Sequence, residues 1–585
     1  MKDIQEFLKK NRLDFFLLPN CNEFFVEYLP KNDKLVEFIT KFSGSNASVV
    51  FTQGQNYFFT DGRYVLQAKN QLDSNLYQVI NISDISLINW LLQNVKNGKK
   101  IALDSRITSV DFIDRCQDIA SGLVFIEHDF LNKIKTKLIE SNGIAIQNKS
   151  AFFCADKICG KNFTQKRDEV VEKLASDALF ISSCENLNWL LNLRGDDIEF
   201  NPIFLAQAIL FKNKKLVILN DHPHLNSLKS QNVELVTKEF FATYLKNYIK
   251  SANIKNFTIQ IDPATTNQAN FQILQNNNAL IIKKNCPISY LKSIKNTTEI
   301  EGAKLSHHHD AIAILKFLYW LDLAKKNNNI AQINEISAQE KLFELRKQNI
   351  GFYASSFATI SGYGANGAII HYQAQTHTNK SFNEDSLYLF DSGAHYLHDD
   401  FMGTTDVTRT IASGQVSAQI IEDYTLVLKG HIALAKIKFP KGTSGSNLDA
   451  IARQYLWNFQ KNYDHGTGHG VGSFSCVHEG PFGIGRGSNL PLCAGIILSN
   501  EPGFYLENKY GIRLENLMLV KEIDKNFLGF TVLTLVPFEL DLIDFKMLTY
   551  PEKKWLNAYH HQIFHQLQAN LSDIERNWYR QKYLF

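Results

Sequence analysis

Apolar runs alternate with amphipathic stretches from the start of the chain. An amphipathic helix is expected first, and the apolar residues 15–18 form a strand after it. Residues 48–51 and 57–60 flank the turn sequence QGQN, a pattern typical of a β-hairpin. Asp61 and Arg63 follow, and we interpret them as turn residues with a local ion pair. The alternation of helix and strand patterns predicts an α/β domain over residues 1–150.

A second α/β domain is predicted over residues 151–296. A helix around 170–176 leads into a strand at 178–182, and residues 206–211 and 215–220 read as buried strands joined by a short turn. Asp14 and Asp177 each precede four apolar residues, and a cysteine follows each aspartate by seven positions, which suggests a duplicated unit. Neither domain contains a glycine-rich phosphate loop, so no nucleotide site is indicated.

Residues 297–585 open with a long helical pattern. Thr297 or Thr298 can cap this helix, with acidic residues in its first turn. The three consecutive histidines 307–309 cannot close on one ion, because neighbours on a helix point in different directions. We interpret them as a surface or interdomain feature. A second helix is expected near 337–348.

Composition narrows the class of protein. The chain has 585 residues, 44% hydrophobic and 21% charged, with a net charge of +3, as expected for a soluble globular protein that binds neither nucleic acid nor an acidic membrane. It shows no targeting signal and no apolar run of 18 residues. Eight scattered cysteines without a CxxC pair indicate reduced thiols in the cytoplasm. Cys476, near His478, lacks the pattern of an activated nucleophile.

Four carboxylates and one imidazole stand out in the second half of the chain. Each lies in a sequence rich in glycine, threonine or proline: FDSGAHY, GTTDVTRT, HGTGHGVG, SNEPGFY and GIRLEN, which contain Asp391, Asp406, His469, Glu501 and Glu515. One such acid alone is more often a solvated or capping residue. Together, hard oxygen ligands with one nitrogen suit a pair of divalent ions such as Mn²⁺, which favours metal-assisted hydrolysis.

The order and contexts of these residues resemble the "pita-bread" metallopeptidases. The sequences FATISGYGANGAIIHY, SCVHEGP and LSNEPGFY narrow the resemblance to the long, three-domain aminopeptidase P, the Xaa-Pro aminopeptidase family. The likeness extends from KFSGSNASVVF near the start to WLNAYH near the end. It implies an α/β (α+β) fold with creatinase-like domains over 1–150 and 151–296. A pita-bread catalytic domain over 297–585 would follow, with a C-terminal extension at 535–585.

The resemblance also implies roles for individual residues. Asp391 and Asp406 would hold one metal ion, and Asp406, His469, Glu501 and Glu515 the other. Manganese is expected, with zinc or cobalt as alternatives. Glu501 would handle the proton, and the family match places His371 and His478 at the substrate carbonyl as catalytic and substrate-binding groups. Arg513 and Tyr505 match positions that support substrate or metal ligands. His465, four residues before His469, is left as a structural neighbour.

The spacing between the first two ligands departs from the family. It is fifteen residues here and eleven in the family, and the excess lies in HDDFM, residues 398–402. If the two segments pair as an antiparallel hairpin, both carboxylates can share a face. An insertion at the tip then leaves the register intact. We expect Asp399 and Asp400 to be turn residues near the site.

The resemblance implies an aminopeptidase that removes the first residue from peptides with proline in second position. Prolidase, which cleaves dipeptides, and a metal-free protein-binding module are the alternatives. A cytoplasmic homodimer is expected. The helical, aromatic-rich tail from residue 549 contributes either a dimer contact or a cap on the catalytic domain.

Overall fold

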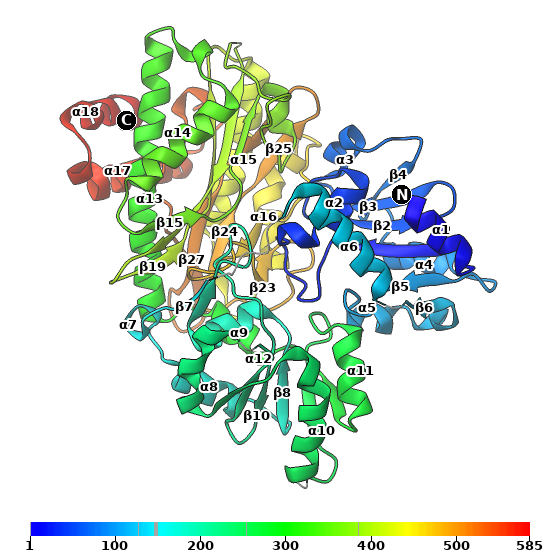
Figure 1. Ribbon diagram of the computed structural model, residues 1–585. Helices are drawn as coiled ribbons and strands as arrows, with labels where there is room; N and C mark the ends of the chain where they lie inside the picture. The colour runs from blue at the N-terminus through cyan, green and yellow to red at the C-terminus, as the bar shows by residue number, and fades with distance from the viewer. Residues whose placement is uncertain (1, 127, 145–149, 221, 253, 384) are drawn as a thin grey trace. The chain divides into compact units, whose positions relative to one another are not determined.

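The computed structural model describes residues 2–126, 128–144, 150–220, 222–252, 254–383 and 385–585 (Figure 1). The chain divides into two compact units. The first comprises residues 1–154 and 161–290, and the second residues 155–160 and 291–585. The first two domains predicted from the sequence thus fall in one unit.

Unit 1 is built on two sheets of six strands. The strands of the first sheet are β1 (Phe15–Pro19), β2 (Ser48–Phe51), β3 (Asn56–Thr60), β4 (Tyr77–Asn81), β5 (Ile101–Leu103) and β6 (Leu123–Phe125). Those of the second are β8 (Ala178–Ile181), β10 (Ala208–Phe211), β11 (Leu216–Ile218), β12 (Val233–Leu235), β13 (Thr258–Ile261) and β14 (Leu280–Lys283). A small ribbon adds β7 (Ala151–Phe153) and β9 (Leu193–Gly195).

The two sheets of unit 1 share one topology. Their strand orders are β4-β3-β2-β1-β5-β6 and β12-β11-β10-β8-β13-β14. In each sheet the first strand pairs antiparallel with the second and parallel with the fifth in chain order. The duplication suggested by Asp14 and Asp177 is therefore present in the backbone, since these residues precede the equivalent strands β1 and β8.

Helices accompany both sheets of unit 1. They are α1 (Lys2–Lys10), α2 (Leu35–Thr40), α3 (Val65–Gln71), α4 (Leu87–Asn94), α5 (Val110–Arg115), α6 (Asp129–Asn142), α8 (Phe163–Glu172), α9 (Cys184–Leu191), α10 (Phe241–Ala252) and α11 (Gln268–Asn276). The helix expected around 170–176 spans Phe163–Glu172, and a capping box at Asn162 sets its start earlier than the apolar pattern indicated. Asp61 and Arg63 form the predicted ion pair, at 2.8 Å.

Unit 2 combines seven helices among its described residues with a set of antiparallel sheets. The helices are α7 (Asp156–Cys159), α13 (Thr297–Lys326), α14 (Glu335–Lys347), α15 (Ala418–Lys436), α16 (Gly445–Trp457), α17 (Tyr550–Leu567) and α18 (Asp573–Tyr583), and the short α12 (Pro287–Ser293) crosses the junction of the two units. Asn296, one residue before the predicted cap, caps α13, because its side chain accepts the Glu299 amide and Glu299 returns the bond.

The strands of unit 2 position the candidate site. They are β15 (Phe352–Ser355), β16 (Ile360–Tyr363), β17 (Leu387–Ser392), β18 (Ala394–Leu397), β19 (Met402–Thr404), β20 (Val407–Ala412), β21 (Lys438–Pro440), β22 (Gly468–Gly470), β23 (Glu479–Ile484), β24 (Ile497–Asn500), β25 (Gly503–Leu506), β26 (Tyr510–Arg513), β27 (Asn516–Glu522) and β28 (Phe527–Val532). The largest sheet has the order β21-β28-β27-β24-β22-β23, and β16-β17-β20 form another.

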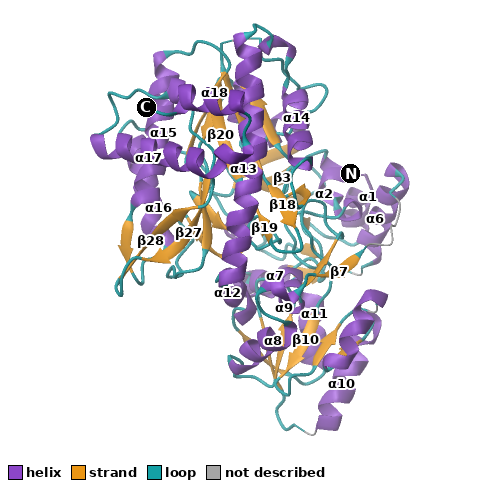
Figure 2. Cartoon of the chain, turned by 90° about the vertical axis from the view of Figure 1, so that its left-hand side faces the viewer, coloured by secondary structure: helices purple, strands orange, loops and turns teal. Residues whose placement is uncertain are grey.

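The C-terminal extension belongs to the core of unit 2. Helices α17 and α18 contact α13, and α17 also contacts α15 (Figure 2). Leu556, Ile563 and Tyr579 of these helices are fully buried in the same apolar cluster as residues of α13 and α15. The extension therefore packs onto unit 2 as a cap, which is one of the two roles predicted for it. Among the helices that the structure describes, none has the length and apolar content needed to cross a bilayer.

The three consecutive histidines have separate environments. His307 is buried, and its Nδ1 atom donates to the Ala303 carbonyl at 2.7 Å. The ring of His309 stacks on Phe401, with centroids 5.3 Å apart. The prediction of a surface feature is thus wrong for His307, because this position lies on the side of α13 that faces the core.

Candidate metal centre

A long two-stranded ribbon carries the first two candidate ligands. Strand β17 pairs with β20, and the ribbon continues as β18 and β19 with the same register, from Leu387↔Ala412 to Leu397↔Met402. Asp391 lies opposite Thr408. Asp406 is two residues from Thr408, so its side chain lies on the face of Asp391. The predicted hairpin geometry is confirmed, with the insertion at the tip.

Neighbouring strands of the six-stranded sheet of unit 2 supply the other three candidate ligands. His469 is in β22, which pairs with β24, and β24 pairs with β27. Glu501 directly follows β24 and Glu515 directly precedes β27, so both lie one step beyond the last pair, Asn500↔Asn516, at the same end of the two strands. The two glutamates therefore leave the sheet at one point, facing each other.

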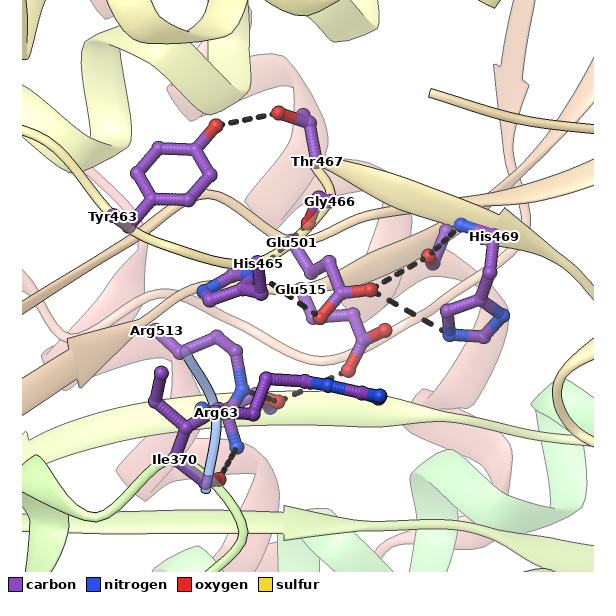
Figure 3. A network of polar contacts seen from close by, with 12 residues as sticks. Arg63, Ile370, Tyr463, His465, Gly466, Thr467, His469, Glu501, Arg513 and Glu515 are labelled. Carbon is purple, nitrogen blue, oxygen red and sulfur yellow. Dashed lines mark hydrogen bonds and ion pairs between the residues drawn. The ribbon is translucent and has the colours of Figure 1, made fainter. Parts of the chain in front are cut away.

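Three of the five residues meet closely. Asp406, His469 and Glu515 each offer a ligand atom within 4.8 Å of the other two. The Nε2 atom of His469 lies 3.4 Å from Asp406 Oδ2. It lies 3.6 Å from Glu501 Oε1, a contact that Figure 3 shows. The Nδ1 atom of His469 donates to the Gly470 carbonyl at 3.0 Å, which leaves Nε2 free to act as a ligand.

Arg513 holds the fifth residue in place. Its Nη2 atom donates to Asp391 Oδ2 at 2.7 Å, whereas Asp391 Oδ1 is buried and has no hydrogen-bond partner among the residues that the structure describes. The guanidinium also donates to Thr408 Oγ1 at 3.1 Å, and Thr408 donates to Glu515 Oε2 at 3.0 Å. Thr408 thus links the arginine to a second carboxylate.

The electrostatics of the cluster favour the binding of cations. Burial raises the pKa of Asp406 well above its usual range, and the charges of Asp391 and Glu501 raise it further. Burial likewise raises the pKa of Glu515, together with the charges of Asp406 and Asp391. Because several acids share so little volume, they hold either protons or positive ions. Oxygen donors with one imidazole and an unpartnered Asp391 oxygen fit hard or borderline divalent ions.

Family matches cover nearly the whole chain. Metallopeptidase family M24 matches residues 303–522, and the C-terminal region of peptidase M24 matches 526–583. Two creatinase/prolidase N-terminal domains match 1–132 and 144–299. Xaa-Pro aminopeptidase 1 of Dictyostelium discoideum is 36% identical over 96% of this chain and 92% of its own length.

The chain belongs to the Xaa-Pro aminopeptidase family.

Solved structures agree with this assignment. The X-prolyl aminopeptidase of Caenorhabditis elegans, described as a cytosolic enzyme with a di-nuclear active site, superposes with a TM-score of 0.89 at 32% identity, covering 97% of this chain and 95% of its own. An Xaa-Pro dipeptidase from Bacillus anthracis matches in fold, with a TM-score of 0.53 and 24% identity, over 65% of this chain. The predicted family and fold class are confirmed, and so is the prediction of a metallo-aminopeptidase.

The remaining residues predicted from the family lie around the metal centre. His478 packs edge-on against His469, with ring centroids 4.3 Å apart. Tyr505 places its hydroxyl between Arg513 Nη1, at 2.7 Å, and His465 Nε2, at 2.8 Å. His371 is half-buried and follows Ile370, whose carbonyl accepts from Arg513 at 3.3 Å (Figure 3).

The tip of the ribbon lies apart from these groups. Asp400 is 74% exposed, and its carboxylate is 3.5 Å from Lys157. Asp399 and Asp400 lie beyond the last pair of the ribbon, Leu397↔Met402, which is six positions past Asp391 along the strand. Both are turn residues, as predicted, but the expectation that they would lie near the site is not supported, since the added residues extend the far end of the ribbon.

The sequence analysis missed two hydroxyl residues. Besides Thr408, Ser499 accepts from the His469 amide at 2.9 Å and donates to Glu501 Oε1 at 3.2 Å. Thr408 lies two residues after Asp406, and Ser499 two residues before Glu501. Because side chains two apart on a strand share a face, this spacing was a usable signal for both.

Proposed function

We propose that this chain removes the N-terminal residue from peptides whose second residue is proline, using two divalent metal ions. The observation that carries the proposal is the meeting of Asp406, His469 and Glu515 in a chain 36% identical to an Xaa-Pro aminopeptidase. Proline forms a tertiary amide without an N–H group, so its peptide bonds call for a dedicated pocket.

Five side chains would hold the metals. Asp391 and Asp406 would hold one ion, and Asp406, His469, Glu501 and Glu515 would hold the other. The donor set favours Mn²⁺, with Zn²⁺ or Co²⁺ as alternatives. When bound, the ions supply a nucleophile from water at neutral pH and polarise the scissile carbonyl.

The chain's own residues then orient the reaction. Arg513 keeps one oxygen of Asp391 engaged and directs the other toward the centre. Glu501, oriented by the Ser499 hydroxyl, takes up the proton of the attacking water and passes it to the leaving proline nitrogen. His478 and His371 donate hydrogen bonds to the carbonyl oxygen as negative charge develops on it. Tyr505 holds Arg513 and His465 in their orientations.

The deciding experiment is hydrolysis of an Xaa-Pro-Xaa tripeptide by chelator-treated protein, with and without added Mn²⁺. We expect release of the first residue only with metal. An Xaa-Ala-Xaa peptide is the matched control for the requirement for proline, and an Xaa-Pro dipeptide separates this activity from prolidase. Cleavage of the dipeptide alone would indicate prolidase. Absence of cleavage with any divalent ion would indicate a binding protein.

We also propose a cytoplasmic location and a homodimer. The first is supported by the cytosolic relative from Caenorhabditis elegans and by eight cysteines that form no disulfide in the part of the chain that the structure describes. The second rests on the resemblance to the family. Sedimentation equilibrium of the full chain tests it, since a mass of twice 66.8 kDa is expected.

A further inference from the structure

A buried arginine lies behind the metal centre and has no assigned role. Arg409 follows Thr408 in β20, so its side chain points to the opposite face of the strand. It is only 1% exposed. Burying a guanidinium costs free energy unless all of its donors find acceptors. The acceptors that Arg409 uses therefore show which parts of the chain its position depends on.

Two of these six acceptors belong to Glu515 and Asn516, and a third is the carbonyl of Thr408 on the strand of Arg409 itself. The Nη1 atom donates to the Glu515 carbonyl at 2.6 Å and to the Thr408 carbonyl at 2.8 Å. The Nη2 atom donates to Asn516 Oδ1 at 2.7 Å. Arg409 thus donates hydrogen bonds to the carbonyl of the candidate ligand Glu515 and to the side chain of the next residue, Asn516.

The other three belong to the C-terminal extension. Nε donates to the Pro537 carbonyl at 2.9 Å, and Nη2 donates to the Val536 carbonyl at 2.6 Å and to the Tyr559 hydroxyl at 3.3 Å. Tyr559 in turn donates to the Val536 carbonyl at 2.9 Å. The guanidinium also lies over the ring of Phe538, 4.3 Å from its centroid.

A histidine extends this network to both glutamate ligands. His431 donates from Nδ1 to the Leu514 carbonyl at 3.1 Å and accepts at Nε2 from Asn516 at 3.2 Å. The carbonyl of His431 accepts from Asn500, the residue before Glu501, at 3.0 Å. The Leu514 carbonyl, the Glu515 carbonyl and the Asn516 side chain are therefore all held by His431 and Arg409, on the side of the strand opposite the metal centre.

We propose that the C-terminal extension, acting through Arg409, is a positioning element of the metal centre. It fixes the backbone on which Glu515 stands, so the carboxylate is oriented before an ion binds. The inference rests on the proposed function, because it assumes that Glu515 is a ligand. It assigns the extension a role in metal affinity in addition to covering the core.

Tyr559→Phe tests the proposal with the smallest change. We expect the affinity of the chelator-stripped full chain for Mn²⁺, measured by calorimetric titration, to fall about tenfold, as for other groups that support metal ligands. Excess Mn²⁺ should restore the tripeptidase activity of the variant. Tyr579→Phe is the matched control: Tyr579 is equally buried in the extension and donates one bond, to the His560 carbonyl at 3.0 Å, away from Arg409.

Arg409→Lys provides a second variant that keeps the charge and loses the planar fork. We expect a 10- to 100-fold loss of Mn²⁺ affinity, since one ammonium cannot reach both Glu515 and the extension. The proposal is overturned if both variants bind Mn²⁺ like the wild type, or if Tyr579→Phe loses as much affinity as Tyr559→Phe. Failure of the wild type to bind any divalent ion would instead overturn the proposed function.

Discussion

Two of the regions in which unit 2 buries carboxylates give them opposite surroundings. Glu335, the first residue of α14, is fully buried and accepts from the amides of Tyr363 at 2.6 Å and Lys380 at 2.9 Å. Asn366 and the Tyr372 hydroxyl donate to the same carboxylate, each at 2.9 Å. Neutral donors thus surround both oxygens of Glu335.

The metal centre shows the reverse. Among the described residues, one oxygen of Asp391 has no hydrogen-bond partner, and Asp406 and Glu515 lie among other acids, with the Thr408 hydroxyl donating to Glu515. The difference distinguishes two uses of a buried acid. A carboxylate with a complete set of donors anchors a loop, here the one that carries His371, whereas a crowded set with free oxygens is suited to bind cations.

The largest effect is expected from His469→Ala in the crowded region. Loss of the imidazole removes the single nitrogen ligand, so kcat/KM should fall on the order of 10⁴-fold or more. The fold should remain, as judged by circular dichroism, and bound metal per chain should decrease. Unfolding of the variant would contradict the view that this region serves binding and not stability.

Glu335→Gln tests the region in which neutral donors surround the buried carboxylate. Replacing one oxygen by an amide nitrogen places a donor against backbone N–H groups, so the free energy of unfolding should fall by about 2–3 kcal/mol. Mn²⁺ affinity should be unchanged. Glu301→Gln is the control, because Glu301 pairs with Lys304 at the surface and should contribute less than about 0.5 kcal/mol. Equal losses from both variants would refute the distinction.

A buried histidine with hydrogen-bond partners at both ring nitrogens should likewise contribute to stability, in a way that depends on pH. His560 accepts the Phe538 amide at 3.1 Å and donates to the Tyr583 carbonyl, and burial lowers its pKa to about 3. The unfolded chain takes up a proton near pH 6.5, so stability is complete above that pH and is lost as pH falls toward 3.

The loss due to His560 should reach about 1.4 kcal/mol per pH unit within this window. Urea unfolding at pH 7 and pH 4.5 measures it. His560→Asn should be less stable at pH 7 and should depend less steeply on pH. An unchanged slope would show that His560 is already protonated in the folded chain.

The smallest effect is expected from Asp406→Asn in metal-free protein. Removing the Asp406 charge relieves its repulsion by Asp391 and Glu501. The free energy of unfolding of the metal-free protein at pH 7.5 should therefore rise by about 0.5–2 kcal/mol, while activity is lost. The same substitution in metal-loaded protein should be destabilising. A less stable metal-free variant would mean that Asp406 is held as firmly as Glu335.

Much of the fold could be predicted from the sequence, because its signals are local. Apolar runs located β1, β2 and β8, and the spacing of Asp14 and Asp177 revealed the duplicated sheet. Errors of one or a few residues arose where neighbours compete for one role, as Asn296 and Thr297 do for the cap of α13.

Sequence patterns and the family resemblance contributed differently to the prediction of the candidate site. Distinctive sequences around each acid pointed to the five metal-binding candidates, and the family match gave them roles. Arg409 and Glu335 could not be found in this way. Their partners are brought close by the tertiary fold alone, such as Pro537 at 128 positions from Arg409, and no periodicity encodes such pairs.

The unbroken register of the ribbon from residue 387 to residue 412 has a consequence for evolution and engineering. With this register, four residues added at the tip, two per strand, would lengthen the arm by about 7 Å without rotating Asp391 or Asp406. Paired insertions are neutral for the direction of both side chains, whereas an unpaired one would turn a carboxylate to the other face. The tip at 398–401 is thus a graft site where length can vary while the chemistry stays fixed.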